Sequence, residues 1–238
     1  MKLLEGHEVI GISEDSYITD AIFFMKQNNI RRIGVFKGRE LIGLFTIEEA
    51  LYHILYNETE YKLKDAKLKQ IIVSDGTLKG VVKDMIENKV DAVFIKRDEG
   101  LRIVTYKDVI REIDWSKASD EIAKIARKAI TASPYSRVRT VASIMVNNHI
   151  RHVPIYEDSL YGILSVRDIV YRYPELDLNT EVSKIMVTEV YSASHDAKIG
   201  KVASDLINLN IGSAIVNGNY IVTLKDLIEY ALRNLLID

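Results

Sequence analysis

Four short segments of the chain place a hydroxyl residue three positions before a carboxylate, at the end of an apolar stretch. Such a pair can do hydrogen-bonding chemistry. The carboxylate accepts from hydroxyl groups, and a hydroxyl residue that caps a helix lies beside backbone N–H groups that favour anions. The sequence shows no glycine-rich phosphate loop and no nucleophile–base pair, so it disfavours an enzymatic role. The pairs are Thr46–Glu49, Thr105–Asp108, Ser165–Asp168 and Thr223–Asp226.

These pairs recur with a period of about 60 residues, which is the signature of an internal repeat. Two further marks keep the same period: an isoleucine or valine after a turn, and a methionine inside the preceding helix. The chain is therefore a fourfold duplication. The segments are GLFTIEE at Gly43–Glu49, RIVTYKD at Arg102–Asp108, GILSVRD at Gly162–Asp168 and YIVTLKD at Tyr220–Asp226, and the marks are Ile30, Val90, Ile150, Ile211, Met25, Met85 and Met145.

The elements that must position each pair are clearest in the third repeat. Apolar residues recur at helical spacing in one segment, and short apolar runs on either side of a polar turn predict a hairpin. The predicted order is strand, helix, strand, strand, helix, and the last helix begins at the hydroxyl residue. The segments are Ala129–Ala132, Val138–Asn148, the runs HVPIY and LYGIL, and Val166–Tyr173.

The other repeats follow the same order, and their boundaries set the expected domains. We expect repeats at residues 1–57, 62–114, 117–174 and 180–238, with short helical connectors inside each pair. A charged, mostly helical stretch at Trp115–Lys128 separates the second repeat from the third. We therefore expect two modules, 1–114 and 117–238. Each half should fold when expressed alone, because a domain of this size is ordinary.

Composition excludes several functional classes. The 238 residues carry a net charge of −2, which gives no basic excess for nucleic-acid binding, and no apolar run is long enough to span a membrane. Cysteine is absent, which removes disulfides and thiolate chemistry and fits a cytoplasmic protein. The histidines show no metal-ligand spacing. The 47% hydrophobic content suffices for real cores.

The repeat resembles the CBS domain, the family named for cystathionine beta-synthase. The resemblance rests on G-h-h-[ST]-x-x-D (h is apolar) at the last strand–helix junction and on the run NHIRHVPI at Asn148–Ile155. It implies an α/β (α+β) fold of tandem CBS-domain pairs. Each pair would form a disc-like Bateman module with pseudo-twofold symmetry. Repeats one and two would form one disc and repeats three and four the other, associated through their helical faces.

The resemblance also implies a regulatory ligand such as AMP, ADP or ATP. Repeat three matches the family best, because Asp168 corresponds to the ribose position and Ser165 to the hydroxyl position. Arg151 and His152 correspond to the phosphate-proximal basic pair, which should favour phosphorylated ligands and would bind them more weakly as His152 loses its charge above about pH 6.5. The base-contacting residues implied by the family are Ile130, Thr131, Ala132, Val153 and Pro154.

The remaining repeats depart from the family pattern. Repeat one offers Arg31, Arg32 and Thr46, but Glu49 stands where aspartate is usual, and its longer side chain puts ribose binding in doubt. Repeats two and four keep a hydroxyl residue and an aspartate but lack the motif glycine and the basic pair. Those two pairs are Thr105 with Asp108 and Thr223 with Asp226.

Several alternatives stay open at this point. Each hydroxyl–carboxylate pair is also an ordinary capping box that stabilises a helix start. His152 and the pair Arg31–Arg32 also fit purely structural roles. The leading hypothesis is an adenine-nucleotide sensor that is not an enzyme, needs no cofactor or metal, forms a homo-oligomer and reports to an unknown effector protein. The alternatives are an interaction scaffold with decayed sites, or a CBS protein that binds S-adenosylmethionine or nucleic acid.

Overall fold

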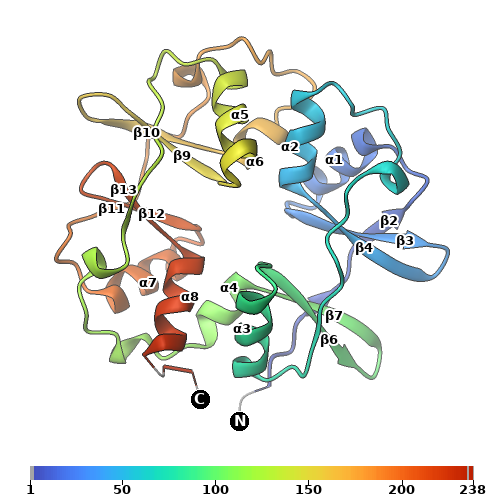
Figure 1. Cartoon of the computed structure of the whole chain (residues 1–238), viewed down its shortest axis with the longest axis horizontal. Coiled ribbons are helices and arrows are strands. Elements are labelled where there is room, and N and C mark those ends of the chain that lie inside the picture. The colour runs from blue at the N-terminus through green and yellow to red at the C-terminus, as the bar shows by residue number, and fades with distance from the viewer. Residues whose placement is uncertain (1–2, 235, 238) are drawn as a thin grey trace. The chain divides into compact units, whose positions relative to one another are not determined.

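The computed structural model describes residues 3–234 and 236–237, and the predicted element order recurs along it (Figure 1). Repeat one contains β2 (Gly11–Ser13), α1 (Ile18–Gln27), β3 (Arg32–Lys37), β4 (Glu40–Thr46) and α2 (Ile47–Leu55). Repeat two contains β5 (Val73–Ser74), α3 (Leu78–Glu87), β6 (Ala92–Arg97), β7 (Gly100–Thr105) and α4 (Tyr106–Glu112). Repeat three contains α5 (Val138–Asn148), β9 (His152–Tyr156), β10 (Leu160–Ser165) and α6 (Val166–Val170). Repeat four contains β11 (Ser192–Ala193), α7 (Ile199–Asn208), β12 (Ser213–Val216), β13 (Tyr220–Thr223) and α8 (Leu224–Arg233).

The first strand of repeat three is shorter than predicted. Residues Ala129–Ala132 form no continuous strand, and Ala132 makes a single parallel bridge to Ile155. The proline two positions later, Pro134, has no N–H to extend the ladder. The preceding residues instead form β8 (Arg127–Lys128), which pairs with β13 of repeat four.

The stretch Trp115–Lys128 is also less helical than predicted. It contains two single turns of 3₁₀-helix, η2 (Trp115–Lys117) and η3 (Ile122–Lys124), followed by β8. Its buried residues Trp115, Ala118 and Ile122 keep the spacing of a helical stripe, but the two turns are separate and no continuous helix joins them. The two predicted short connectors do appear as single helical turns, η1 (Leu63–Asp65) and η4 (Val182–Lys184).

The first long helix of every repeat is followed, within two residues, by a residue with left-handed backbone geometry. Because this conformation reverses the chain, the next residue begins the return path to the hairpin. The isoleucine or valine that marks the repeat always follows this residue. In repeat three the helix runs through Asn148 and His149 takes the left-handed position, although the sequence favours asparagine. The four residues and their φ values are Asn29 (52°), Lys89 (54°), His149 (53°) and Asn210 (54°).

The hairpin register places the start of each hairpin opposite the cap of the following helix. In repeat three, His152 pairs with Ser165 across the antiparallel strands β9 and β10. This register brings the start of each hairpin, which is basic in repeats one and three, and the hydroxyl–carboxylate pair to the same end of the hairpin. The equivalent pairs are Arg32 with Thr46, Ala92 with Thr105 and Ser213 with Thr223.

The outer edge of each hairpin is covered in one of two ways. In repeats two and four a strand from an earlier part of the chain pairs with it, namely β1 (His7–Glu8) on β7 and β8 on β13. In repeats one and three the connector that follows makes a single bridge, Leu44 to Lys69 and Ile163 to Val187.

This difference explains which repeats keep the motif glycine. A Cβ added at Gly162 would lie 2.6 Å from the Val187 carbonyl oxygen, and one at Gly43 would lie 2.8 Å from the Leu68 Cβ. Such contacts are too short for a side chain, so the close connector requires glycine. Arg102 and Tyr220, which replace it, face the paired strands β1 and β8.

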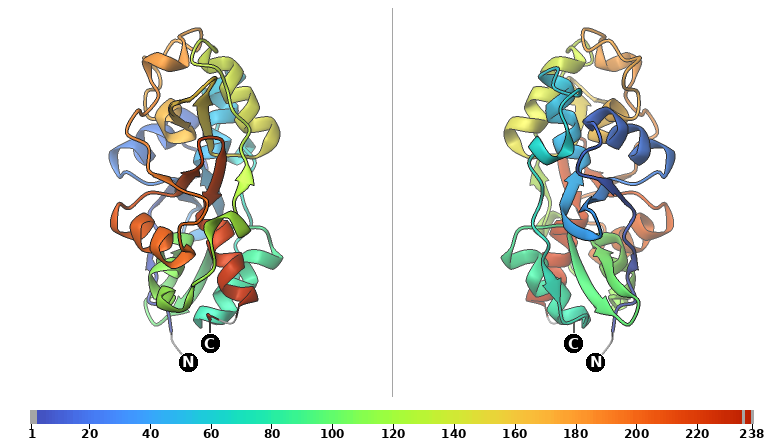
Figure 2. Two further views of the ribbon diagram at one scale, coloured as in Figure 1. Left: turned by 90° about the vertical axis from the view of Figure 1, so that its left-hand side faces the viewer. Right: turned by 90° about the vertical axis from the view of Figure 1, so that its right-hand side faces the viewer.

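The helices bury two separate apolar cores. In one compact unit, residues 10–71 and 130–189, helix α2 of repeat one packs on α5 and α6 of repeat three (Figure 1; Figure 2). In the other, residues 1–9, 72–129 and 190–238, helix α4 of repeat two packs on α7 and α8 of repeat four. We refer to these as the odd unit and the even unit.

The compact units therefore do not follow the two expected halves of the chain. The contacts between helices join repeats that are not adjacent in sequence. Phe45, Leu51, Val141 and Ile169 share the odd core, and Val81, Ile110, Leu206 and Leu227 share the even core. The association of adjacent repeats as modules remains a prediction.

Candidate binding site in the odd unit

The three motif aspartates all use one carboxylate oxygen to stabilise the start of a helix. In repeat three, Asp168 Oδ2 accepts from the Ser165 backbone N–H at 2.7 Å and from the Ser165 hydroxyl at 2.6 Å. The Ser165 Oγ in turn accepts from the Asp168 N–H at 3.3 Å. The predicted capping box is thus present. Repeats two and four repeat the arrangement with Thr105 and Asp108, and with Thr223 and Asp226.

Glu49 of repeat one behaves differently. Thr46 caps α2 by accepting from the Glu49 N–H at 3.5 Å. Among the described contacts, Glu49 does not return the bond that the aspartates make, which is expected from its longer side chain. The sequence prediction that repeat one departs from the others at this position is consistent with this geometry.

The second carboxylate oxygen distinguishes the three aspartates. His7 Nε2 lies 2.7 Å from Asp108 Oδ1, and Arg127 makes an ion pair with Asp226 Oδ1. In repeat three the basic group beside Asp168 Oδ1 is Arg172, whose Nη1 is 3.9 Å away and donates at 2.7 Å to the Asp168 backbone oxygen instead. Asp168 thus has the carboxylate oxygen most available to a ligand.

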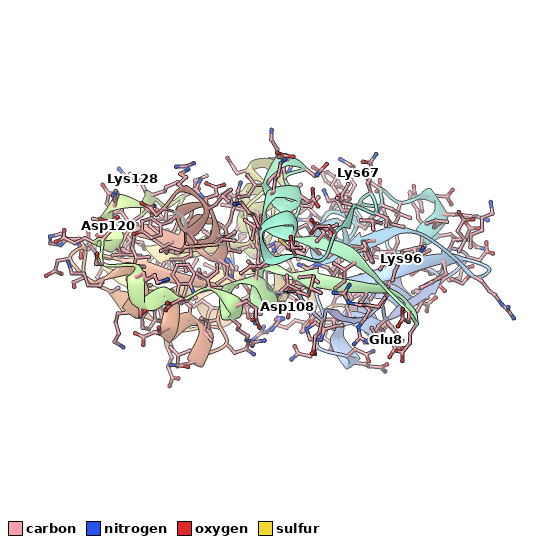
Figure 3. All side chains as sticks on the ribbon, turned by 90° about the horizontal axis from the view of Figure 1, so that it is seen from below. Glu8, Lys67, Lys96, Asp108, Asp120 and Lys128 are labelled. Carbon is pink, nitrogen blue, oxygen red and sulfur yellow. The ribbon has the colours of Figure 1, made fainter. Side chains whose placement is uncertain are left out.

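His7 and Arg127 were not among the residues that the sequence singled out. They lie on β1 and β8, at equivalent places two repeats apart, and each reaches the aspartate of the hairpin on which its strand pairs. Figure 3 labels Asp108 and the chain neighbours of the two residues, Glu8 and Lys128. His7 and Arg127 are separated by two repeat periods, and this spacing is the signal in the sequence that could have identified them. Because of these partners, Asp108 is in contact with His7 and Asp226 is held in an ion pair with Arg127, and Asp226 is only 6% exposed.

Three arginines of the odd unit lie close enough to His152 to act on its charge. Loss of hydration on burial, followed by the positive charges of Arg31, Arg151 and Arg167, lowers the pKa of His152 to about 3. His152 is therefore neutral near pH 7 in this structure, because a proton there would be poorly hydrated and repelled by the arginines. Arg151 and His152 were expected to be two charged groups. In the structure His152 is neutral, and the positive charge comes from the arginines.

The arginines are not equivalent to one another. Arg151 forms an ion pair with Glu48, the second residue of α2. Arg167 occupies the equivalent second position of α6, so a basic residue stands there in place of the glutamate. Arg167 Nε is buried without a hydrogen-bond partner among the described residues, and its guanidinium lies 5.4 Å from the centre of the Tyr171 ring. The sequence analysis did not single out Arg167, although its position two residues after Ser165, equivalent to Glu48 after Thr46, was visible in the sequence.

The backbone at the start of α6 is largely occupied. The Val166 N–H donates to the Arg151 carbonyl at 2.9 Å, and the Ser165 and Asp168 N–H groups are bonded within the capping box. Each of the other repeats makes the bond equivalent to that of Val166. A phosphate would therefore meet arginine side chains rather than the helix amides that we expected. The equivalent bonds join Ile47 to Arg31, Tyr106 to Asp91 and Leu224 to Gly212.

The residues expected to contact a base occupy different environments. Ile130 is 43% exposed, whereas Val153 is fully buried in the odd core. The Ala132 N–H donates to the Pro154 oxygen at 3.1 Å, and the Ala132 oxygen accepts from Tyr156 at 2.9 Å. Both backbone groups of Ala132 are therefore used within the sheet. Thr131, between Ile130 and Ala132, is partly exposed.

Two further findings concern metals and membranes. The described part of the chain contains no group of three or more histidine, aspartate or glutamate residues arranged to hold a metal ion. Within residues 3–234 and 236–237, no helix is both long and apolar enough to cross a bilayer.

Comparison with known proteins identifies a family that matches part of the chain. The model of the family described as CBS domain matches residues 6–56 and 120–175. These two segments of the chain carry the CBS-domain pattern. The matched residues correspond to repeats one and three, which keep the motif glycine, and all of them except 6–9 and 120–129 lie in the odd unit.

Relatives of similar length share this architecture. The uncharacterized protein MJ1225 from Methanocaldococcus jannaschii is 22% identical over 275 residues, covering 97% of this chain and 98% of that protein. The crystal structure of MJ1225, described as a proposed archaeal homologue of g-AMPK, matches with a TM-score of 0.82 at 21% identity, covering 95% of this chain and 97% of that one. An uncharacterized conserved protein from Pyrococcus horikoshii matches with a TM-score of 0.63 at 17% identity, covering 94% and 95%.

A shorter match is the mitochondrial CBS domain-containing protein CBSX3 from Arabidopsis thaliana. It is 29% identical over 108 residues, which cover 41% of this chain and 52% of that protein. These similarities establish the CBS fold over nearly the whole chain.

Proposed function

We propose that this chain is a regulatory protein that binds an adenine nucleotide at the repeat-three site of the odd unit. The observation that carries the proposal is the state of Asp168. Its Oδ2 anchors the cap while its Oδ1 is 3.9 Å from the nearest basic nitrogen, so Oδ1 is positioned to accept from a ribose hydroxyl. The CBS family provides the general precedent for a ligand of this kind.

The charges around His152 favour a phosphorylated ligand. Arg31 and Arg167 add positive charge beside the neutral imidazole, and arginine binds phosphate oxygens through paired N–H groups. Arg151 is already paired with Glu48, so we assign it the smaller share of phosphate binding. Neutral His152 can still donate one hydrogen bond.

The proposal includes a partner. Occupancy of the site would change the packing of α6 against repeat one, and an effector protein would recognise that change. Ligand and effector would then alter one another's affinity by the same factor. The effector, the homo-oligomeric state and the identity of the nucleotide among AMP, ADP and ATP belong to the proposal.

Calorimetric titration with AMP, ADP, ATP, adenosine and S-adenosylmethionine tests the proposal. Asp168→Ala should weaken nucleotide binding at least about tenfold, because hydrogen bonds to a charged group contribute about 1.5–3 kcal/mol. Asp108→Ala is the matched control, because it removes the same capping bonds in repeat two. Asp108→Ala and Glu49→Ala should each change nucleotide affinity only slightly.

The runner-up function is an interaction scaffold in which every capping box serves only its helix. Absence of binding by all five ligands would favour the scaffold. Equal losses in Asp168→Ala and Asp108→Ala would show that the cap, rather than a ligand contact, explains the effect. Preference for S-adenosylmethionine over the phosphorylated ligands would contradict the assignment of the arginines to phosphate.

A further inference from the structure

Tyr171 connects repeat three to repeat one by hydrogen bonds. Its hydroxyl donates to the Ile30 carbonyl at 2.7 Å and lies 3.3 Å from the Met25 carbonyl, at the end of α1. Loss of hydration on burial is the main cause that raises the pKa of Tyr171, so the hydroxyl stays protonated and remains a donor. The tyrosine follows α6 directly, three residues after Asp168.

The Ile30 carbonyl belongs to the peptide group that precedes Arg31. The carbonyl of Arg31 itself accepts from the Ile47 N–H at 2.8 Å. The backbone of Arg31 is thus held on both sides, by Tyr171 before it and by the start of α2 after it. Loss of the tyrosine hydroxyl would release the first of these two restraints.

The ring of Tyr171 also contacts the second arginine. The Arg167 guanidinium lies 5.4 Å from the ring centre, within the range of a cation–π interaction. Arg167 Nε has no hydrogen-bond partner among the described residues, so the ring is the contact that orients its guanidinium. One side chain therefore restrains Arg31 through its hydroxyl and Arg167 through its ring.

We propose that Tyr171 is a positioning residue that sets selectivity for phosphorylated over unphosphorylated ligands by holding Arg31 and Arg167 at the repeat-three site. The inference rests on the proposed nucleotide-binding function. It assigns the phosphate preference to the contact between repeats one and three rather than to repeat three alone. Tyr171 itself need not touch the ligand.

The equivalent residue in repeat one provides a matched control. Tyr52 stands six residues after Thr46, as Tyr171 stands six residues after Ser165. Tyr52 is 39% exposed and packs on His53 and Tyr56. A second control is Tyr173, whose hydroxyl lies 2.8 Å from the Thr59 hydroxyl and joins repeat three to the linker that follows repeat one.

The experiment measures the affinities of AMP and adenosine by calorimetry in the full chain and in three variants: Tyr171→Phe, Tyr52→Phe and Tyr173→Phe. Tyr171→Phe should weaken AMP binding about three- to tenfold, the effect of about one hydrogen bond, and leave adenosine binding within about twofold. Both controls should keep the wild-type ratio of the two affinities. In an Arg31→Gln background, Tyr171→Phe should have little further effect on AMP, because its target is already removed.

Several outcomes would overturn the inference. Equal losses of AMP and adenosine in Tyr171→Phe would show a general structural role. An unchanged AMP-to-adenosine ratio in Tyr171→Phe, or the same change in Tyr173→Phe, would exclude a specific link to the arginines. If the wild-type chain binds neither ligand, the proposed function fails and this inference fails with it. If the wild-type chain prefers AMP and Tyr171→Phe keeps the same preference, this inference is wrong while the proposed function stands.

Discussion

Each motif aspartate uses its two carboxylate oxygens for different tasks. Oδ2 holds the helix cap in repeats two, three and four, whereas Oδ1 meets His7, Arg172 or Arg127 according to the repeat. The same residue type at the same position therefore makes an internal side-chain contact in the even unit and is a candidate ligand contact in the odd unit. The neighbouring charge decides which role is possible.

Arg127→Ala should destabilise the protein more than His7→Ala. Asp226 is 6% exposed, so removal of Arg127 leaves a buried carboxylate with fewer partners, at a cost of about 1–3 kcal/mol. The His7 side chain is 67% exposed, and exposed ion pairs contribute less than about 1 kcal/mol. Urea unfolding of both variants checks this order. Equal losses would contradict it.

His152 should make stability depend on pH. Its pKa is about 6.5 when unfolded and about 3 when folded, so the unfolded chain binds more protons between these values. The contribution is complete above about pH 6.5 and is lost as pH falls towards 3. The free energy of unfolding contributed by His152 changes by at most about 1.4 kcal/mol per pH unit, and its total change is on the order of a few kcal/mol.

Denaturant unfolding at pH 7.5 and pH 5 measures this dependence. His152→Asn should reduce the loss of stability between the two pH values relative to wild type. His149→Asn is the control, since His149 is exposed in the left-handed position that asparagine tolerates. An identical pH dependence in all three proteins would contradict the assignment to His152.

At the scale of elements, the hairpins show how one repeat is adapted to two neighbours. In the odd unit, connectors cross close to Gly43 and Gly162, and in the even unit strands β1 and β8 add to the sheet. The added strands also bring His7 and Arg127 to the aspartates. Loss of the motif glycine and loss of the available carboxylate in the even repeats thus have one structural cause.

Gly162→Ala should destabilise the protein by about 1–3 kcal/mol, because the new methyl group would lie 2.6 Å from the Val187 oxygen and 3.0 Å from the Met186 sulfur. Tyr220→Ala, at the same register in repeat four, should change stability by less than about 1 kcal/mol, since Tyr220 is 42% exposed. Thermal unfolding compares the two. A neutral Gly162→Ala would show that the connector can move away.

At the scale of the whole molecule, each apolar core combines repeats that are not adjacent in sequence. Either half of the chain supplies one repeat to the odd unit and one to the even unit. The halves expected from the sequence would therefore each expose apolar helix faces on α2 and α4, or on α5, α6, α7 and α8. Another molecule must cover these helix faces before either half is stable.

We accordingly expect residues 1–114 and 117–238, expressed separately, to self-associate rather than remain stable monomers. Mixing should give a one-to-one complex with a higher melting temperature than either half, because the native helix contacts re-form. Sedimentation and thermal unfolding measure both effects. Two monomeric halves that unfold cooperatively at the wild-type temperature would contradict this expectation and restore the simpler division at residues 115–128.

The sequence by itself determined the fourfold repeat, the order of elements and the capping boxes. These depend on local periodicity and on residues three positions apart, as in Ser165 and Asp168, and a short segment specifies them without knowledge of its neighbours. It also distinguished repeat three as the most complete copy. The mismatch at Glu49 was visible for the same reason.

Only the tertiary structure decided which charges meet. The contacts of His7 with Asp108, of Arg151 with Glu48 and of Tyr171 with Ile30 each join residues about 100 or more positions apart, and several pairings were compatible with the sequence. The neutral state of His152 likewise depends on burial and on Arg31, which belongs to another repeat. Electrostatic energies depend on distance and hydration, and the packing of the helices sets both.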